Sequence, residues 1–299
     1  MKILLLGKNG QVGWELQRAL APLGELIALD FDSPGPLSAD FSQPESLAAT
    51  LRTVAPQIIV NAAAHTAVDK AESEVDFARK LNATAPAVLA REAAALGAWL
   101  VHYSTDYVFD GSGSAPRDES APTGPLSVYG LTKLEGEQAI RDSGCRHLIL
   151  RTSWVYAARG GNFAKTMLKL AAERDKLSVI NDQFGAPTGA DLLADITAHA
   201  IRATQHNAAL DGTYHAVAAG ETTWHGYARF VIEWARAHGQ PVKVAAEAIE
   251  AVPTSAFPTP AKRPLNSRLN TTRLRGAFAL NLPHWQQGVE RMLTEVFQR

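Results

Sequence analysis

Short apolar runs alternate with amphipathic stretches along the first half of the chain. Five runs have the length of a strand, at residues 2–6, 25–30, 57–61, 98–104 and 147–153. Four stretches with a helical spacing of apolar residues occupy positions 11–20, 44–54, 76–95 and 126–142. The strand-length runs are continuously apolar, which is typical of strands buried on both faces. This order predicts an α/β fold, a Rossmann-type doubly wound parallel sheet with helices on both faces.

The pattern changes after residue 152. Helical spacing recurs at 163–173, 190–203, 223–237 and 286–297, and turn-forming residues cluster at 157–162, 182–187 and 252–264. The simplest division is a dinucleotide-binding domain at residues 1–152 and a smaller, mixed C-terminal lobe at 153–299 that mainly binds substrate. Segments of the second half can still return to the first sheet.

The first apolar run leads directly into a loop with three glycines. Gly7, Gly10 and Gly13 have the spacing G-x-x-G-x-x-G, and the next helical stretch begins inside this loop. Glycine permits the tight turn, the approach of backbone to a diphosphate and close contact between helix and strand. The N–H groups at the start of the helix would face the phosphates. The loop therefore predicts a dinucleotide site, although such glycines also occur in ordinary strand–helix turns.

Two acidic residues follow this loop. Asp30 ends the second run, about 20 residues after the glycines, where a carboxylate would bind the adenine ribose hydroxyls. It would repel a 2′-phosphate and favour NAD over NADP, or it simply caps the turn after the strand. Asp40 and Phe41 either border the adenine or form an ordinary surface turn. Since Lys8 in the loop weakens the preference, the choice between NADH and NADPH stays open.

A second constellation combines Thr105, Tyr129 and Lys133. Thr105 lies at the end of the fourth run, the edge where open α/β sheets bind ligands. Tyr129 and Lys133 are four residues apart, so on a helix they share one face. An adjacent ammonium would stabilise tyrosinate and lower the phenol pKa from its ordinary value near 10. The phenol could then donate a proton to a carbonyl oxygen that Thr105 also polarises.

These motifs resemble the extended short-chain dehydrogenase/reductase superfamily, and within it the reductases of nucleotide-linked keto sugars. The similar stretches span nearly the whole chain, at residues 7–17, 61–72, 104–109, 129–133, 151–156, 179–188 and 263–269. The resemblance implies NAD(P)H-dependent reduction of the 4-keto group of a dTDP-4-dehydro-6-deoxy-L-sugar, giving dTDP-L-rhamnose. The cofactor would be NADPH or NADH, and the partner a nucleotide-sugar substrate.

The resemblance also implies roles for individual residues. It makes Tyr129 the proton donor, Lys133 its modulator and a cofactor contact, and Thr105 the third catalytic residue. Substrate contacts fall on Thr105, Asp106 and Trp154. Cofactor contacts fall on Gly7, Gly10, Gln11, Val12, Gly13, Asp30, Asp40, Phe41, Ala64, His65, Thr66, Tyr129 and Lys133.

Related activities remain as alternatives. Nucleotide-sugar dehydratases carry Thr-Asp-Glu after the fourth strand and need that glutamate to expel water. Here Tyr107 follows Asp106, which argues against dehydration. Epimerases share the fold and are set aside mainly on the later motifs. A regulatory subunit without activity would not be expected to keep both Tyr129 and Lys133.

Composition narrows the partners. The 29 basic and 30 acidic residues leave a net charge of −1, so nucleic-acid binding is not expected. The single cysteine, Cys145, cannot form an intrachain disulfide. No apolar run approaches the ~20 residues of a membrane span, and the first is too short for a signal peptide. A cytoplasmic protein without membrane contact is expected.

No metal is expected in catalysis, since the histidines lack zinc-binding spacing. The resemblance does imply a homodimer with Mg²⁺ at the dimer contact in some members. The carboxylates at the matching positions are Glu15, Asp191 and Glu295, which could equally be solvated surface acids.

Overall fold

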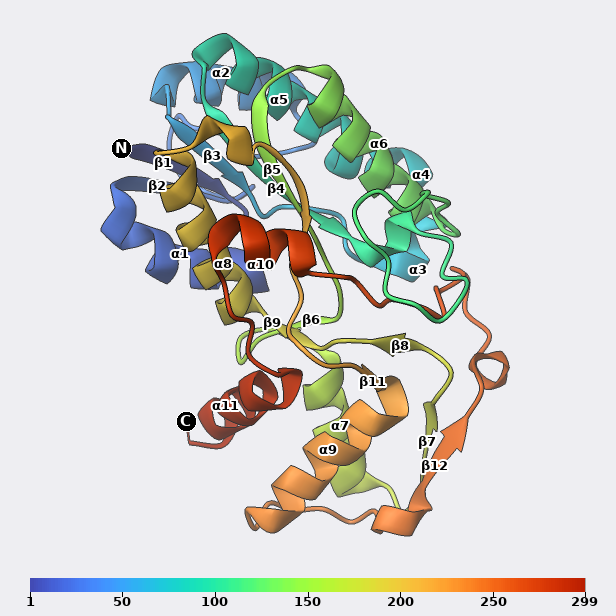
Figure 1. Cartoon of the computed structure of the whole chain (residues 1–299). Helices are drawn as coiled ribbons and strands as arrows, with labels where there is room; N and C mark the ends of the chain where they lie inside the picture. Colours follow the sequence, from blue (N-terminus) through green and yellow to red (C-terminus); the bar gives the residue numbers. More distant parts are fainter. Residues whose placement is uncertain (299) are drawn as a thin grey trace.

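The computed structural model describes residues 1–298 and contains a central sheet of six parallel strands (Figure 1). The strand order is β10-β5-β4-β3-β1-β2. The strands are β1 (Lys2–Leu6), β2 (Glu25–Leu29), β3 (Ile58–Asn61), β4 (Trp99–Thr105), β5 (Arg146–Thr152) and β10 (Gly212–His215). The order reverses beside β1, which confirms the doubly wound Rossmann-type sheet.

Helices cover both faces of this sheet (Figure 1). On one face lie α1 (Gln11–Leu20), α8 (Ala190–Thr204) and α10 (Thr272–Phe278), and on the other lie α2 (Pro44–Val54), α5 (Ala85–Leu96) and α6 (Val128–Asp142). Successive residues of β1 supply both cores: Ile3 and Leu5 pack against the first group, Leu4 and Leu6 against the second. Burial on both faces explains why the strands read as continuously apolar.

The predicted helix at 76–95 is interrupted. The structure has α4 (Val75–Arg79), a π-helical segment (Lys80–Thr84) and then α5. Pro86 has no N–H to continue the regular hydrogen-bond ladder, and the N–H of Ala85 bonds to the carbonyl of Lys80. The wide turn places the buried Asn82 side chain against Thr132 of α6, at 3.2 Å.

The second half divides between two bodies. Helices α8 and α10 and strand β10 belong to the central sheet domain. The smaller lobe is built on α7 (Phe163–Glu173), α9 (Trp224–Ala237) and α11 (Trp285–Phe297). Its short strand pairs are β6 (Val155–Tyr156) with β9 (Thr188–Gly189), β7 (Leu177–Ile180) with β12 (Ile249–Val252), and β8 (Phe184–Gly185) with β11 (Thr222–Thr223).

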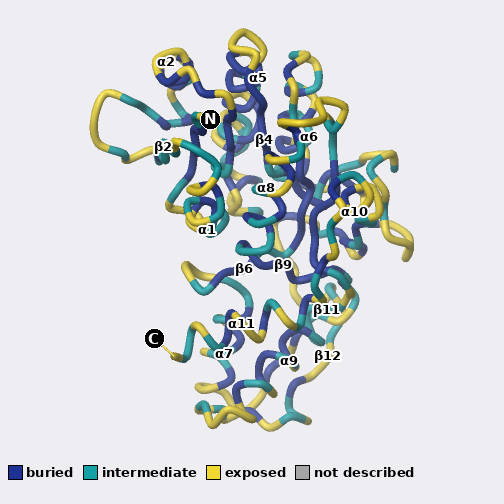
Figure 2. Tube along the Cα trace, turned by 60° about the vertical axis from the view of Figure 1, so that its left-hand side comes forward, coloured by how far each residue is buried: buried dark blue, intermediate teal, exposed yellow. Residues whose placement is uncertain are grey.

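Each body has its own apolar interior, as the dark blue segments of Figure 2 show. The core of the lobe contains the large buried side chains of Tyr156, Tyr227 and Trp285. The connections between the bodies run past β6 and β9, beyond the carboxyl ends of the central strands. No helix within residues 1–298 combines the length and apolar character needed to cross a membrane.

Candidate active site

The glycine loop joins β1 to α1 in a tightly packed turn. Gly7 has φ +88°, and a Cβ there would lie 2.7 Å from the nitrogen of Ala63. A Cβ on Gly13 would overlap the carbonyl oxygen of Gly7. At Gly10 the nearest atom would be 3.5 Å away, so the backbone there is open to a ligand. Helix α1 starts after Gly10 with no side-chain cap, which leaves its first N–H groups available to an anion.

Asp30 connects this loop to the end of β2. One carboxylate oxygen accepts the backbone N–H of Asn9 and the other accepts that of Phe31, both at 2.9 Å. The carboxylate is therefore placed beside the glycine loop, and it also caps the turn after the strand. Both interpretations of Asp30 made from the sequence are compatible with this geometry.

The other predicted cofactor residues lie on loops after β2 and β3. The Phe41 ring is buried in the sheet core, and Asp40 accepts the N–H of Ser42 at 2.8 Å, as in an ordinary turn. His65 is buried between Ala64 and the exposed Thr66, and its Nε2 lies 3.4 Å from Glu74. Nδ1 of His65 and Oε1 of Gln11 are among the buried polar atoms that have no hydrogen-bond partner within residues 1–298.

The sheet edge at β4 brings the three predicted catalytic residues together. Thr105 ends β4, and Tyr129 and Lys133 occupy the first two turns of α6. Ser127 caps this helix by accepting the N–H of Gly130 at 3.2 Å. A Cβ on Gly130 would overlap the carbonyl oxygen of Tyr107, so only glycine lets α6 lie this close to the end of β4.

The pKa values of Tyr129 and Lys133 differ from the sequence-based expectation. Burial raises the pKa of Tyr129 to about 12, and a hydrogen bond with the Thr105 hydroxyl acts in the opposite direction. The expected lowering of the phenol pKa by Lys133 is therefore wrong for the protein by itself, because burial dominates and Lys133 is not among the groups that shift this pKa. Burial also lowers the pKa of Lys133 to about 8. The Lys133 Nζ instead donates to the carbonyl of Tyr103 at 2.6 Å and lies 3.1 Å from Nε2 of His102.

The predicted substrate contacts flank this pair. Asp106 is buried beside Thr105, whose hydroxyl donates to Oδ1 at 3.1 Å. Burial raises the pKa of Asp106 to about 6, and hydrogen bonds with the hydroxyls of Ser267 and Thr105 act in the opposite direction. Trp154 has φ +49° and stacks on Trp224 of the lobe, with ring centroids 3.7 Å apart. The stacked pair was not foreseen from the sequence, since Trp224 reads as ordinary helix packing.

A buried ion pair links α6 to β5. Glu137 accepts from Arg151 Nε at 2.8 Å and Nη2 at 2.6 Å, and from the Ser104 hydroxyl at 2.6 Å. Its side chain is 0% exposed. Arg141, one turn further along the helix, adds a contact at 3.0 Å. The sequence does not single out this cluster, because α6 carries other charged residues as well, Lys133, Glu135 and Asp142 among them.

Arg263 joins the lobe loop to the first domain. Its guanidinium forms a bidentate pair with Asp69, at 3.1 and 2.7 Å. Tyr107 occupies the position where dehydratases have glutamate, and its ring packs edge-on against Tyr129 at 5.5 Å. Burial raises the pKa of the Tyr107 phenol above its ordinary range, so it is no substitute for a carboxylate base.

The expected Mg²⁺ ligands do not form a site in this chain. Glu15 lies 3.6 Å from Arg18, and Asp191 lies 3.4 Å from Arg291. Glu295 is the third carboxylate that the resemblance implied as a ligand. Across residues 1–298, no group of three or more metal-ligating side chains is assembled.

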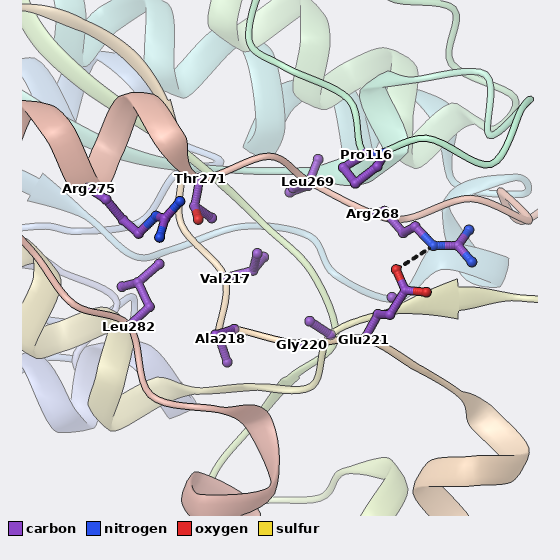
Figure 3. A pocket seen from close by; sticks show the side chains of 13 residues that line it. Pro116, Val217, Ala218, Gly220, Glu221, Arg268, Leu269, Thr271, Arg275 and Leu282 are labelled. Carbon is purple, nitrogen blue, oxygen red and sulfur yellow. Dashed lines mark hydrogen bonds and ion pairs between the residues drawn. The ribbon is translucent and has the colours of Figure 1, made fainter.

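A separate pocket of about 240 Å³ opens between the lobe and α10, and none of the predicted site residues lines it. Figure 3 shows Arg275 and Thr271 facing into it, while Arg268 is bound to Glu221 at 2.7 Å.

Comparisons with known proteins agree with this geometry. The family model described as RmlD substrate binding domain matches residues 1–298. A dTDP-4-dehydrorhamnose reductase of Shigella flexneri is 61% identical, over 99% of this chain and 98% of its own. A dTDP-4-dehydrorhamnose reductase structure from Clostridium acetobutylicum superposes with TM-score 0.87 at 34% identity, covering 100% of both chains. Another, from Bacillus anthracis in complex with NADP, has TM-score 0.87 at 34% identity and covers 98% of this chain and 99% of its own.

Proposed function

The chain belongs to the RmlD substrate binding domain family, that of the dTDP-4-dehydrorhamnose reductases, and from this premise we propose that it reduces the 4-keto group of dTDP-4-dehydrorhamnose to give dTDP-L-rhamnose. The observation that carries the proposal is the grouping of Thr105, Tyr129 and Lys133 at the carboxyl end of β4, beside an open glycine loop. A reduced nicotinamide dinucleotide supplies the hydride when bound.

The residues present fit such a dinucleotide. Gly10 leaves room for a diphosphate, and the uncapped start of α1 offers N–H groups to it. The unpartnered Oε1 of Gln11 and Nδ1 of His65 are buried polar atoms that a ligand could satisfy. The residues that would hold the cofactor are Gly7, Gly10, Gln11, Val12, Gly13, Asp30, Asp40, Phe41, Ala64, His65, Thr66, Tyr129 and Lys133.

Tyr129 acts as the proton donor. With a pKa raised to about 12, its phenol keeps its proton at neutral pH and releases it only to a strong base. The oxygen of a keto group becomes such a base as its carbon is reduced. Thr105, hydrogen-bonded to the phenol, orients the same oxygen. The ammonium form of Lys133 stabilises the tyrosinate that is left.

The sugar lies between this edge and the lobe. Thr105 and Asp106 would contact it from the end of β4, and Trp154 would contact it from the first segment of the lobe. The stack of Trp154 on Trp224 fixes one wall of that space, because both rings lose their freedom to rotate. The homodimer and the cytoplasmic location stay predictions.

Substitution of Tyr129 tests the proposal. In Tyr129→Phe, kcat for dTDP-4-dehydrorhamnose should fall by roughly 10²-fold or more, because a phenyl ring has no proton to give. The consumption of NADPH or NADH at 340 nm follows the reaction. Tyr214→Phe is a matched control, since Tyr214 lies on β10 and its hydroxyl donates to the carbonyl of Leu210, apart from the predicted site residues. Near-normal turnover in Tyr129→Phe would remove this residue from the mechanism.

The cofactor preference is tested at Asp30. If its carboxylate repels a 2′-phosphate, Asp30→Ala should shift the ratio of kcat/KM values toward NADPH. Asp32→Ala is the matched control, because Asp32 is exposed and lies 3.5 Å from the side chain of Asn9. A wild type that strongly prefers NADPH, with a ratio unchanged in Asp30→Ala, would show that Asp30 serves only as a cap.

A further inference from the structure

Three buried polar side chains form a chain of contacts beneath the catalytic tyrosine. Asn61 ends β3, His102 lies in β4 and Lys133 lies in α6, and each is at most 2% exposed. The Nδ2 of Asn61 lies 2.9 Å from Nδ1 of His102. The Nε2 of the same imidazole lies 3.1 Å from Nζ of Lys133. Neither Asn61 nor His102 has a role in the reaction described above.

The direction of these hydrogen bonds is set at Asn61. Its Oδ1 accepts the backbone N–H of Ala63 at 3.0 Å, and a backbone N–H can only donate. The amide nitrogen of Asn61 therefore faces His102 and must donate to Nδ1. Burial lowers the pKa of His102 well below its ordinary value, so the ring is neutral. Its single hydrogen must then be on Nε2.

That hydrogen is directed at Lys133. An ammonium group has three donors and no acceptor, so a charged Lys133 would place two donors face to face at 3.1 Å. A neutral amine has a lone pair that accepts from His102 Nε2, and it can still donate to the carbonyl of Tyr103 at 2.6 Å. Only the neutral amine makes both contacts of the His102 ring, with Asn61 and with Lys133, a donor facing an acceptor.

We propose that His102 is a positioning residue, locked by Asn61 as the Nε2–H tautomer, which donates to Lys133 Nζ and favours the neutral amine over the ammonium. The tautomer lock does not depend on the proposed function. Its consequence for turnover does, because it sets the pH above which the ammonium needed beside Tyr129 is lost.

The charged groups around Lys133 do not reverse this preference. On its own helix Glu137 favours the ammonium, but this carboxylate is paired with Arg151 of β5 at 2.6 Å. The π-helical segment packed against α6 contributes the neutral Asn82. Asp106 of the turn after β4 acts on Tyr129. Burial lowers the pKa of Lys133 to about 8, and the hydrogen of His102 acts in the same direction.

Two substitutions reverse the lock by different routes. Asn61→Asp keeps an acceptor for Ala63 and presents a second oxygen to His102 Nδ1, so the ring hydrogen moves to Nδ1 and Nε2 can accept from an ammonium. His102→Gln can turn its amide oxygen toward Lys133 without adding charge. Both should raise the midpoint of the Lys133 titration by about one pH unit or more.

The titration is measured by NMR of the full chain labelled with 13C at the lysine ε-carbon, with the Lys133 signal assigned by its loss in Lys133→Met. In the wild type the signal should titrate at or below about pH 8, against about 10.4 for ordinary lysine. Asn207→Asp, which adds the same charge at an exposed cap, and His147→Gln are matched controls that should not move it. A wild-type midpoint near the ordinary value would overturn the proposal. So would a midpoint that stays in place in whichever of Asn61→Asp and His102→Gln folds.

The second readout is the pH profile of kcat/KM. For reduction the alkaline limb should follow the loss of the Lys133 ammonium, and it should move upward in Asn61→Asp by the same amount as the NMR midpoint. A purely structural role for His102 would lower activity at every pH and leave the limb in place. If the protein proved not to reduce the sugar, the NMR shift would still be seen, so the two failures are distinguishable.

Discussion

The ion pair between α6 and β5 makes the stability of α6 depend on one buried carboxylate. Glu137 accepts two hydrogen bonds from Arg151 and one from Ser104, and it has no solvent exposure. Glu137→Gln preserves the shape but removes the charge. Arg151, 3% exposed, would then be a buried cation without its counter-charge. Breaking a buried pair in this way costs about 3–5 kcal/mol in the free energy of unfolding.

Two further variants isolate the cause of that loss. Arg141→Met removes the partner of Glu137 that is 33% exposed, and it should cost less than about 1 kcal/mol. Replacing both buried charges, in Glu137→Leu with Arg151→Met, should recover most of the loss, because the cost comes from an unpaired charge. The free energy of unfolding of Glu137→Gln, Arg141→Met and the double variant is measured by urea unfolding, followed by circular dichroism at pH 7. A double variant no more stable than Glu137→Gln would refute this reasoning.

The pH dependence of the same pair has a definite sign. Burial opposes the ionisation of Glu137, yet its bonds with Arg151, Ser104 and Arg141 hold its pKa below the ordinary value. A lowered carboxylate pKa contributes stability that is complete above the unfolded value of about 4.3 and is lost as the pH falls through the folded value. The difference in stability between wild type and Glu137→Gln should therefore shrink below about pH 4, as repeated urea titrations would show.

Two other substitutions test the loop and the sheet edge. Gly13→Ala should abolish dinucleotide binding in isothermal calorimetry, because its Cβ would overlap the Gly7 carbonyl. Gly24→Ala is the control: its Cβ would overlap the Met1 carbonyl, so it reports a general loss of folding without a change in the glycine loop. Dinucleotide binding retained in Gly13→Ala would contradict the proposed packing. Asp106→Asn should be more stable than wild type at pH 7 by about 3 kcal/mol, but not at pH 3. Burial raises the pKa of Asp106 to about 6, so the folded protein loses stability as the pH rises from the unfolded value of about 3.9 through that value. Equal thermal stabilities of the two proteins at pH 7 would argue against that cost.

The local features of this protein could be predicted from its sequence. The bounds of β1, α1, α2 and α7 coincide with the predicted ranges, because the spacing of apolar residues that predicts each element lies within the element itself. The glycine loop and the Tyr129–Lys133 spacing are likewise local, so a dinucleotide site and an acid–base pair could be predicted from the sequence. The π-helical segment at Lys80–Thr84 was not predicted: Pro86 is visible in the sequence, but the contacts of Asn82 with His65 and Thr132 that accompany the wide turn join residues 17 and 50 positions apart.

Tertiary structure decided which distant polar groups meet, and with that their acidities. Lys133 bonds to His102, 31 positions earlier, and Arg263 pairs with Asp69, 194 positions earlier. The pairing of β10 with β5 at the edge of the sheet likewise joins segments that are far apart in the sequence. Periodicity records which face of an element is buried, but not which element covers it. The phenol and the lysine were therefore evident from the sequence, whereas their pKa values follow from burial and partners that only the folded chain brings together.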